Sequence, residues 1–263
     1  MSAALRLPSL LAIGALACHG GGSGLPRGQI VDLSHAFDAQ TIYWPTEEGF
    51  AFERGFAGET QAGYYYEAHR FRAAEHGGTH LDAPAHFARG GRHVDELPLE
   101  RLVGEAVLVD VRPACARDRD YRVGVEDLAA FEREHGAIPR GAIVLLRTGF
   151  GLFWPDRERY LGTAARGPQA VRDLHFPGLH PEAARWLVAE RGVAAVGLDT
   201  ASIDHGPSAL FEAHRVLSEA GVPALENLAR LESLPPRGFQ VIALPMKIRA
   251  GSGAPLRAVA LLP

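Results

Sequence analysis

The sequence predicts an α/β fold, because helical segments alternate with short apolar runs of the kind found in buried strands. Residues 106–111 and 142–147 are predominantly apolar and have the length of strands that are buried on both faces. Between them, residues 125–135 show a helical spacing of apolar positions and are followed by Gly136, a typical helix stop. Such alternation predicts one core built from a sheet and the helices that pack on it.

The rest of the chain continues this pattern. A helix is expected over 181–191, with Pro181 in its first turn and Gly192 after its end. A last helix is expected to be capped by Ser208 and to run to Ala220. Further strands are expected at 29–33, 64–71, 193–198, 222–226 and 239–248.

No core element is predicted between residues 150 and 180, although the segment is rich in aromatic residues. These are Phe150, Phe153, Trp154, Tyr160 and Phe176. A long loop of this kind is often a lid or a pocket wall. A surface insertion that packs on its own aromatic residues is the alternative.

The composition is that of a globular protein, with 263 residues and 47% hydrophobic residues in a chain without internal repeats. The 27 basic and 31 acidic residues give a formal net charge of −4, which argues against a nucleic-acid partner. Only two cysteines occur, Cys18 and Cys115. A thiolate metal site is therefore excluded, and any metal must be held by nitrogen and oxygen.

Residues 1–24 have the composition of an export signal followed by a Gly/Ser linker. Arg6 precedes a short apolar run over 7–17, which is too short to span a membrane, and Cys18 is followed by small residues. This resembles a bacterial lipoprotein signal, in which Cys18 would carry the lipid. We expect an exported protein, periplasmic or anchored through Cys18, with one domain over 25–263. A cytoplasmic protein with a non-functional N-terminal segment is the alternative.

The densest chemical signal is the run His-Gly-Gly-Thr-His-Leu-Asp-Ala-Pro-Ala-His over residues 76–86. It holds three of the 12 histidines of the chain and one carboxylate. Neutral imidazole and carboxylate are the ligands that Zn²⁺, Mn²⁺ and similar divalent ions bind. The run therefore predicts a metal site.

Local geometry suggests how these ligands converge. His80 and Asp82 share parity in an extended segment, and the two glycines before them let His76 turn toward the same spot. His86 has the same parity beyond Pro84, so its side chain can lie over the same spot. Two imidazoles and one carboxylate leave a coordination position open, which is typical of a catalytic site.

A second metal would need ligands from elsewhere, with Asp82 as a bridge. His214 and Glu226 are credible ligands, on a predicted helix and at a strand end. Spacing alone favours a hydrogen-bonded core histidine at 214, expected on a buried face with Leu210 and Leu217. Asp199 and Asp204 either orient imidazoles or cap loops, and spacing slightly favours caps.

The run 76–86 resembles the signature of the metal-dependent cyclase/hydrolase family, which includes bacterial kynurenine formamidases (arylformamidases) and isatin hydrolases. The resemblance extends from about residue 30 to the C-terminus. It includes the segments 199–204, His214 with 226–228, 245–248 and 251–255.

The resemblance implies a swivelling β/β/α fold, commonly dimeric, and a role for each matching residue. His76, His80 and Asp82 match the ligands of a first metal, Asp82 and Glu226 match bridging carboxylates, and His214 matches a ligand of a second metal. His86 matches the catalytic acid/base, and Trp44 matches an aromatic residue beside the substrate. Formamidases of the family tend to hold two Zn²⁺, and isatin hydrolases use Mn²⁺.

The expected function is hydrolysis of an amide or formamide C–N bond in a small aromatic substrate, by metal-activated water with His86 as acid/base at a pKa near 6.5. Aromatic residues from the 150–160 region are expected to help Trp44 hold the substrate. An isatin hydrolase-like cyclic amidase or lactonase is one alternative. A non-catalytic, exported metal-binding lipoprotein is another. The chain has neither the Gly-x-Ser-x-Gly of serine hydrolases nor the His-Glu-x-x-His of zincins.

Overall fold

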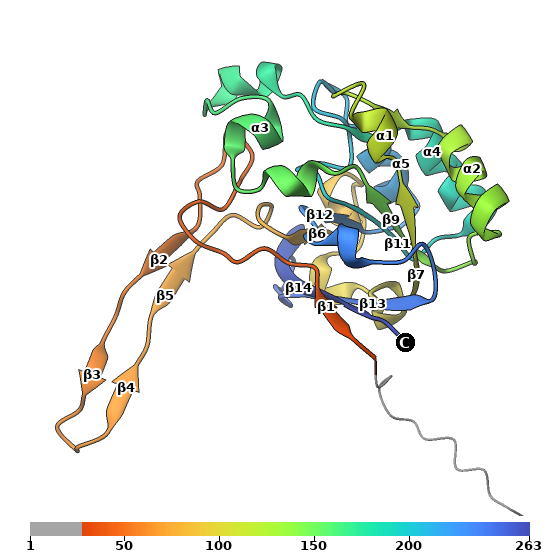
Figure 1. Ribbon diagram of the computed structural model, residues 1–263. Helices are drawn as coiled ribbons and strands as arrows, with labels where there is room; N and C mark the ends of the chain where they lie inside the picture. Colours follow the sequence, from red (N-terminus) through yellow and green to blue (C-terminus); the bar gives the residue numbers. More distant parts are fainter. Residues whose placement is uncertain (1–27) are drawn as a thin grey trace, which may run out of the picture.

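One large sheet forms the body of the protein, and it closes on itself. The computed structural model describes residues 28–263 (Figure 1). The strand order is β1-β14-β13-β7-β9-β11-β12-β6, and β6 also pairs with β14, which makes the sheet barrel-like. The strands are β1 Ile30–Asp32, β6 His80–Asp82, β7 Val103–Asp110, β9 Ile143–Arg147, β11 Ala195–Leu198, β12 Ala224–Glu226, β13 Phe239–Pro245 and β14 Gly253–Leu261.

Helices cover one side of the central parallel strands β7, β9, β11 and β12, as an α/β fold requires (Figure 1). The helices are α1 Arg112–Cys115, α2 Val125–His135, α3 Arg157–Leu161, α4 Pro181–Trp186 and α5 Glu212–Glu219. Val144 of β9 faces the helical layer, whereas its neighbour Leu145 faces the interior of the closed sheet. Both faces are buried, which explains the predominantly apolar runs and confirms the predicted fold class.

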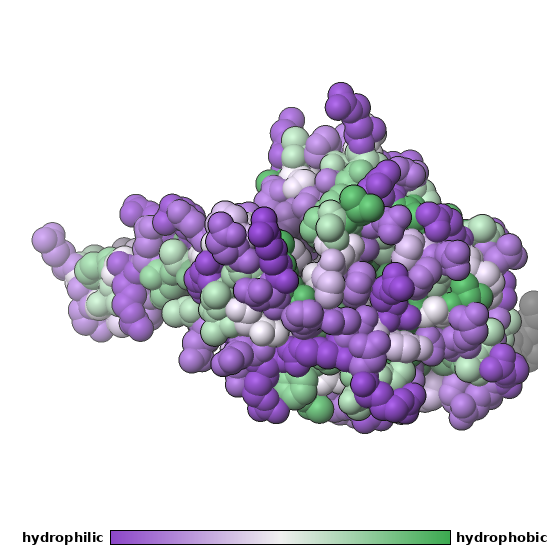
Figure 2. Space-filling view, turned by 90° about the horizontal axis from the view of Figure 1, so that it is seen from above, coloured by the Kyte–Doolittle hydropathy of each residue, from purple (hydrophilic) through white to green (hydrophobic). Residues whose placement is uncertain are grey.

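The single strand expected over 64–71 is observed as two short strands outside the main sheet. These residues belong to a long arm that projects from the body and contains two short strand pairs (Figure 1). The four strands are β2 Ala51–Glu53, β3 Ala57–Glu59, β4 Tyr65–Glu67 and β5 Arg70–Arg72. The alternation of aromatic and polar residues does mark strands here, but the ribbon has no core beneath it, and apolar residues line its surface (Figure 2).

The last helix begins later than expected, because a side chain outside the predicted segment caps it. α5 starts at Glu212, and Ser208 lies in a turn before it. The carboxylate of Asp204 accepts hydrogen bonds from the backbone N–H groups of residues 213 and 214, both at 3.0 Å. Leu210 thus lies outside the helix and is 65% exposed, not buried as predicted.

Two further regions depart from the prediction. Strand β14 was not expected, because Gly253 and Pro255 at its start resemble loop residues. The helix over 181–191 continues beyond α4 as a π-helical turn over 187–191, and Gly192 stops it in the left-handed region at a φ of 53°. The other expected strands match observed ones within a few residues at their ends, with β13 stopping at Pro245.

The segment 150–180 packs against the body instead of forming a separate lid. It contains α3 and the short strand β10 Gly178–Leu179, which pairs with β8 Arg122–Val123. Tyr160 and Phe176 are fully buried in the core. Within residues 28–263 no helix has the length and apolar character needed to cross a bilayer. The expected signal and linker over 1–24 and Cys18 lie outside the described residues.

Candidate metal centre

Strand β6 lies at the centre of the site. It is paired on both edges, with β12 on one side and β14 on the other. Its residues His80 and Asp82 point to the same side, as their parity predicts. Glu226 of β12 lies opposite His80 in the antiparallel register, and Gly253 of β14 lies opposite Asp82. The sheet closure therefore brings residues that are distant in sequence to one place.

A turn brings the third residue of the predicted set to the same point. Gly78 adopts the left-handed conformation, with a φ of +57°, which lets the chain reverse before His80. The ring of His76 then lies over the start of β14. A Cβ atom on Gly253 would stand 2.4 Å from the Cε1 atom of His76, so only glycine permits this approach.

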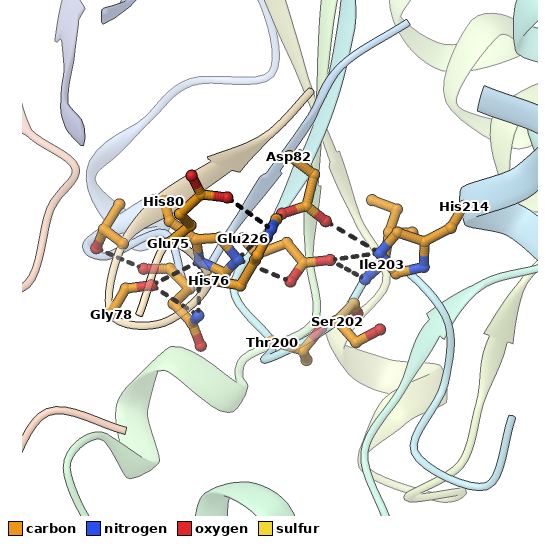
Figure 3. Close-up of polar contacts among 12 residues, drawn as sticks. Glu75, His76, Gly78, His80, Asp82, Thr200, Ser202, Ile203, His214 and Glu226 are labelled. Atoms are coloured by element: carbon orange, nitrogen blue, oxygen red, sulfur yellow. Dashed lines mark hydrogen bonds and ion pairs between the residues drawn. The ribbon is translucent and has the colours of Figure 1, made fainter. Parts of the chain in front are cut away.

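The first group of potential metal ligands consists of His76, His80 and Asp82 (Figure 3). Asp82 Oδ1 lies 2.7 Å from His76 Nδ1 and 3.2 Å from His80 Nε2. His80 and Asp82 are buried, and His76 is partly buried. The structure thus brings together the three residues that the sequence predicted would converge.

A second group shares Asp82 with the first and adds His214 and Glu226 (Figure 3). His214 Nε2 lies 3.1 Å from Asp82 Oδ2 and 3.1 Å from Glu226 Oε1. The other oxygen of Glu226, Oε2, lies 3.4 Å from His80 Nε2. Each of the two carboxylates therefore presents one oxygen to each group, which is the arrangement that bridging carboxylates require.

Each of the three imidazoles is also held through the nitrogen that faces away from Asp82 and Glu226. His76 Nε2 lies 2.9 Å from Ser252 Oγ, His80 Nδ1 lies 2.9 Å from the carbonyl oxygen of residue 78, and His214 Nδ1 lies 2.6 Å from Asp204 Oδ2. These partners orient the rings, as the outer contacts of metal-binding histidines do. Asp204 thus orients an imidazole as well as capping α5, whereas Asp199 only caps the loop over 148–151.

The charged groups of the cluster shift one another's pKa values. Burial alone would raise the pKa of Asp82, but the surrounding imidazoles hold it well below its usual value. Burial and the neighbouring Asp82 charge raise the pKa of Glu226. Burial would lower the pKa of His214, but the carboxylates of Asp204, Asp82 and Glu226 raise it well above its usual value. A buried cluster of two carboxylates and three imidazoles is therefore stable only when it shares protons or cations.

His86 lies beside the two groups and belongs to neither. It ends a 3-10 turn over Pro84–His86, and its ring stacks on His76 with centroids 3.8 Å apart. Neither of its nitrogens has a hydrogen-bond partner among residues 28–263. Burial lowers the pKa of His86 to about 4, which corrects the expected value near 6.5 and keeps the ring neutral at pH 7.

The cluster forms the floor of a cavity of about 410 Å³. Trp44, predicted to border the substrate, is in its wall together with Phe87 and Phe211. The Phe211 ring centroid lies 6.1 Å from that of Trp44 and 5.3 Å from that of Phe87. None of the aromatic residues of 150–160 lines this cavity, so that prediction is wrong: these side chains pack into the core or over the surface.

Sequence reasoning missed several residues of the site. Phe87 follows the histidine run directly, and its position there was the only available signal. Phe211 enters the wall because its backbone is left-handed, with a φ of 47°, which no motif indicates. Ser252 and Asn227 lie in segments that carried the family resemblance but had no role assigned.

Comparison with known proteins agrees with this geometry. The family described as "Putative cyclase" matches residues 31–205. The isatin hydrolase of Roseibium aggregatum is 34% identical over 72% of this chain and 72% of its own length. The kynurenine formamidase of Salinibacter ruber is 33% identical over 88% of this chain and 96% of its own length.

The fold comparison gives the same result. The solved structure of isatin hydrolase A from Labrenzia aggregata, bound to benzyl benzoate, superimposes with a TM-score of 0.79 and 35% identity. It covers 89% of this chain and 93% of that one. The cyclase-type fold expected from the sequence is therefore confirmed. The chain belongs to the cyclase family, and it is a metal-dependent hydrolase of that family.

Proposed function

We propose that the protein hydrolyses the amide C–N bond of a small aromatic substrate, either an open-chain aryl formamide or a cyclic aryl amide. The observation that carries this proposal is the shared carboxylate Asp82, which joins two groups of potential metal ligands at the floor of a cavity with aromatic walls. The names of the relatives, isatin hydrolase and kynurenine formamidase, support it.

The residues fit one or two divalent cations. His76, His80 and Asp82 would hold the first, and Asp82, His214 and Glu226 would hold the second, with the two carboxylates shared. The donor set of imidazole nitrogen and carboxylate oxygen suits Zn²⁺ or Mn²⁺. The outward nitrogen of each imidazole is already engaged, which leaves the inward nitrogen for a cation.

When bound, a divalent cation polarises the amide carbonyl and makes water acidic enough to supply hydroxide near neutral pH. The chain contributes the proton transfers. Neutral His86 accepts the proton of the attacking water and returns it to the leaving nitrogen, so that a C–O bond forms as the C–N bond breaks. Trp44, Phe87 and Phe211 hold the aryl ring and exclude bulk water.

The cavity favours substrates without an acidic group. Within the part of the chain that the structure describes, no lysine or arginine lines it, whereas Glu47 and Glu75 do. A carboxylate on the substrate would find no cation to pair with in this wall and would be repelled by the two glutamates. Isatin and formanilide carry no carboxylate and therefore suit this wall, whereas N-formylkynurenine brings an ammonium group that the glutamates can attract and a carboxylate that has no cationic partner there.

The test is a hydrolysis assay of the purified protein, loaded in turn with Zn²⁺ and Mn²⁺, on isatin, formanilide and N-formylkynurenine. Metal content is measured by mass spectrometry on the same samples. We expect turnover of at least one uncharged substrate at a higher kcat/KM than that of N-formylkynurenine. Stoichiometric metal binding with no turnover of any of the three would favour the metal-binding lipoprotein instead.

Phe211→Ala is expected to raise the KM for an aryl substrate by about 10-fold or more, since burying an aromatic ring face contributes on the order of 1–2 kcal/mol. Metal content should not change, because the side chain donates no ligand atom. Steady-state kinetics on the preferred substrate measures the effect. Leu210→Ala is the matched control, since this neighbour is exposed and does not line the cavity. An unchanged KM in the Phe211 variant would remove that ring from the substrate site.

We propose that the arm over 51–72 contacts a second copy of the chain in a homodimer. Six aromatic side chains of the arm are more than half exposed: Phe52, Phe56, Tyr64, Tyr65, Tyr66 and Phe71. A two-stranded ribbon without a core is only marginally stable alone, and a patch of this kind marks an interface. The arm carries both Glu and Arg side chains, which suits pairing with an identical surface.

Sedimentation velocity tests this interface. The wild type is expected to sediment as a dimer, and the double variant Tyr65→Ser, Phe52→Ser as a monomer. Leu99→Ser, which alters an equally exposed apolar residue away from the arm, should leave the dimer intact. A monomeric wild type, or a dimer that both variants preserve, would contradict the proposal.

We also propose that the protein is exported and anchored through lipid on Cys18, as the composition of residues 1–24 suggests. Incorporation of labelled palmitate during expression in a bacterium tests this. Labelling should be lost in Cys18→Ser and retained in Cys115→Ser, whose sulfur is buried in the core. Unlabelled wild-type protein in the cytoplasm would support the alternative location.

A further inference from the structure

A chain of buried hydrogen bonds leads from the segment 150–180 to the imidazole of His80. The hydroxyl of Tyr160 donates to Asn227 Oδ1 at 2.9 Å, and Asn227 Nδ2 donates to the carbonyl oxygen of Gly78 at 2.8 Å. The same carbonyl oxygen lies 2.9 Å from His80 Nδ1. We infer that Tyr160 and Asn227 are positioning residues that orient His80 toward the metal. This inference rests on the proposed metal centre.

The direction of the first hydrogen bond fixes the orientation of the Asn227 amide. A tyrosine hydroxyl is fully buried here, and its donation to Oδ1 leaves Nδ2 as the group that faces Gly78. A flipped amide would place two oxygens against each other at the carbonyl. The Tyr160 hydroxyl also lies 3.2 Å from the carbonyl oxygen of Asp199, so Tyr160 and the Gly78 carbonyl together favour the orientation in which Nδ2 meets the turn.

The second hydrogen bond holds the Gly78 carbonyl group in place. This carbonyl group in turn determines which nitrogen of His80 carries the proton. The Gly78 carbonyl oxygen accepts from Asn227 and from His80 Nδ1, so the His80 proton stays on Nδ1 and Nε2 faces Asp82 and Glu226. Gly78 is left-handed and has no side chain to hold the turn, so this carbonyl depends on its acceptor contacts for a fixed direction.

The backbone of Asn227 is left-handed and hydrogen-bonded, which fixes the position of its side chain. Its φ is 54°, in the left-handed region that asparagine tolerates better than most residues. Its N–H donates to the carbonyl oxygen of Thr200, and its own carbonyl oxygen accepts from Thr79 Oγ1. The backbone of residue 227 is therefore held through both its N–H and its carbonyl group, one residue beyond Glu226, which fixes the point from which the side-chain amide extends.

A double-mutant cycle on metal affinity tests the inference. Zn²⁺ affinity is measured by competition with a chromophoric chelator for the wild type, Tyr160→Phe, Asn227→Gly and the double variant. Glycine keeps the left-handed backbone of residue 227. We expect Asn227→Gly to weaken binding about 10-fold, as loss of an outer contact to a metal-binding histidine does, and Tyr160→Phe to weaken it a few-fold. In the Asn227→Gly background, Tyr160→Phe should have no further effect.

A matched control and a spectroscopic readout separate positioning from general stability. Tyr121→Phe removes a tyrosine hydroxyl that donates to Asp127 away from the site, and it should leave the affinity unchanged. In the metal-free protein, the Nδ1–H proton of His80, which the Gly78 carbonyl oxygen accepts, should give a ¹H–¹⁵N signal that exchanges slowly with solvent in the wild type and faster in Asn227→Gly. Folded Tyr160→Phe protein with wild-type affinity, or equal losses in both backgrounds, would overturn the inference. A wild type that binds no metal would instead refute the metal centre itself.

Discussion

His86→Ala is expected to lower kcat by a factor of about 10²–10⁴, the range that a positioned general acid–base contributes. The ring lies in the cavity wall, stacks on His76, and is free to meet water and substrate through both nitrogens. Because His86 belongs to neither ligand group, the variant should keep its metal. Initial rates at saturating substrate and metal analysis of the same preparation measure the two effects.

His93→Ala is the matched control for this experiment. His93 is a nearby histidine that precedes a 3-10 turn and does not line the cavity. Its kcat should equal that of the wild type. If His86→Ala loses its metal together with its activity, His86 is a ligand and not the acid/base. If it keeps full turnover, another group carries the proton.

Asp82→Asn is expected to abolish tight metal binding and turnover, because this residue supplies an oxygen to both ligand groups. The metal-free protein should also lose stability. His76, His80 and His214 all contact this carboxylate, so its removal leaves buried imidazoles without their shared anion, which costs about 3–5 kcal/mol. Urea unfolding of the metal-free variants measures the loss.

The control for stability is Glu48→Gln. Glu48 pairs with Arg72 at 3.1 Å on the surface, and removing such a pair changes the free energy of unfolding by about 0–1 kcal/mol. A metal content for Asp82→Asn equal to that of the wild type would contradict the assignment of Asp82 as the shared ligand. An equal unfolding free energy for the two variants would show that Asp82 does not hold the cluster together.

The sequence predicted best what local geometry determines. His76, His80 and Asp82 meet because strand parity and a glycine turn act within seven residues. His214 and Glu226 depend on pairings between distant strands, so spacing alone favoured an ordinary core histidine at 214, and only the family resemblance indicated its place. Trp44 was likewise identified through the resemblance alone.

The remainder of the site could not be read from spacing, because it depends on contacts far along the chain. The late start of α5 follows from capping by Asp204, eight residues before the first helical residue, and Phe211, left-handed just before the helix, lies in the wall. Residues 64–71 of the arm were predicted as a single strand, because exposed and half-buried strands share the same alternation of aromatic and polar residues.

The closure of the sheet by β14 has a consequence for how the protein matures. Strand β6 needs β14 on one edge, and the support of His76 by Ser252 comes from the residue just before that strand. Neither contact can form until residues 252–255 have been synthesised and have joined β6. The cation-binding pocket therefore assembles late in the folding of this domain, after most of its strands have been made.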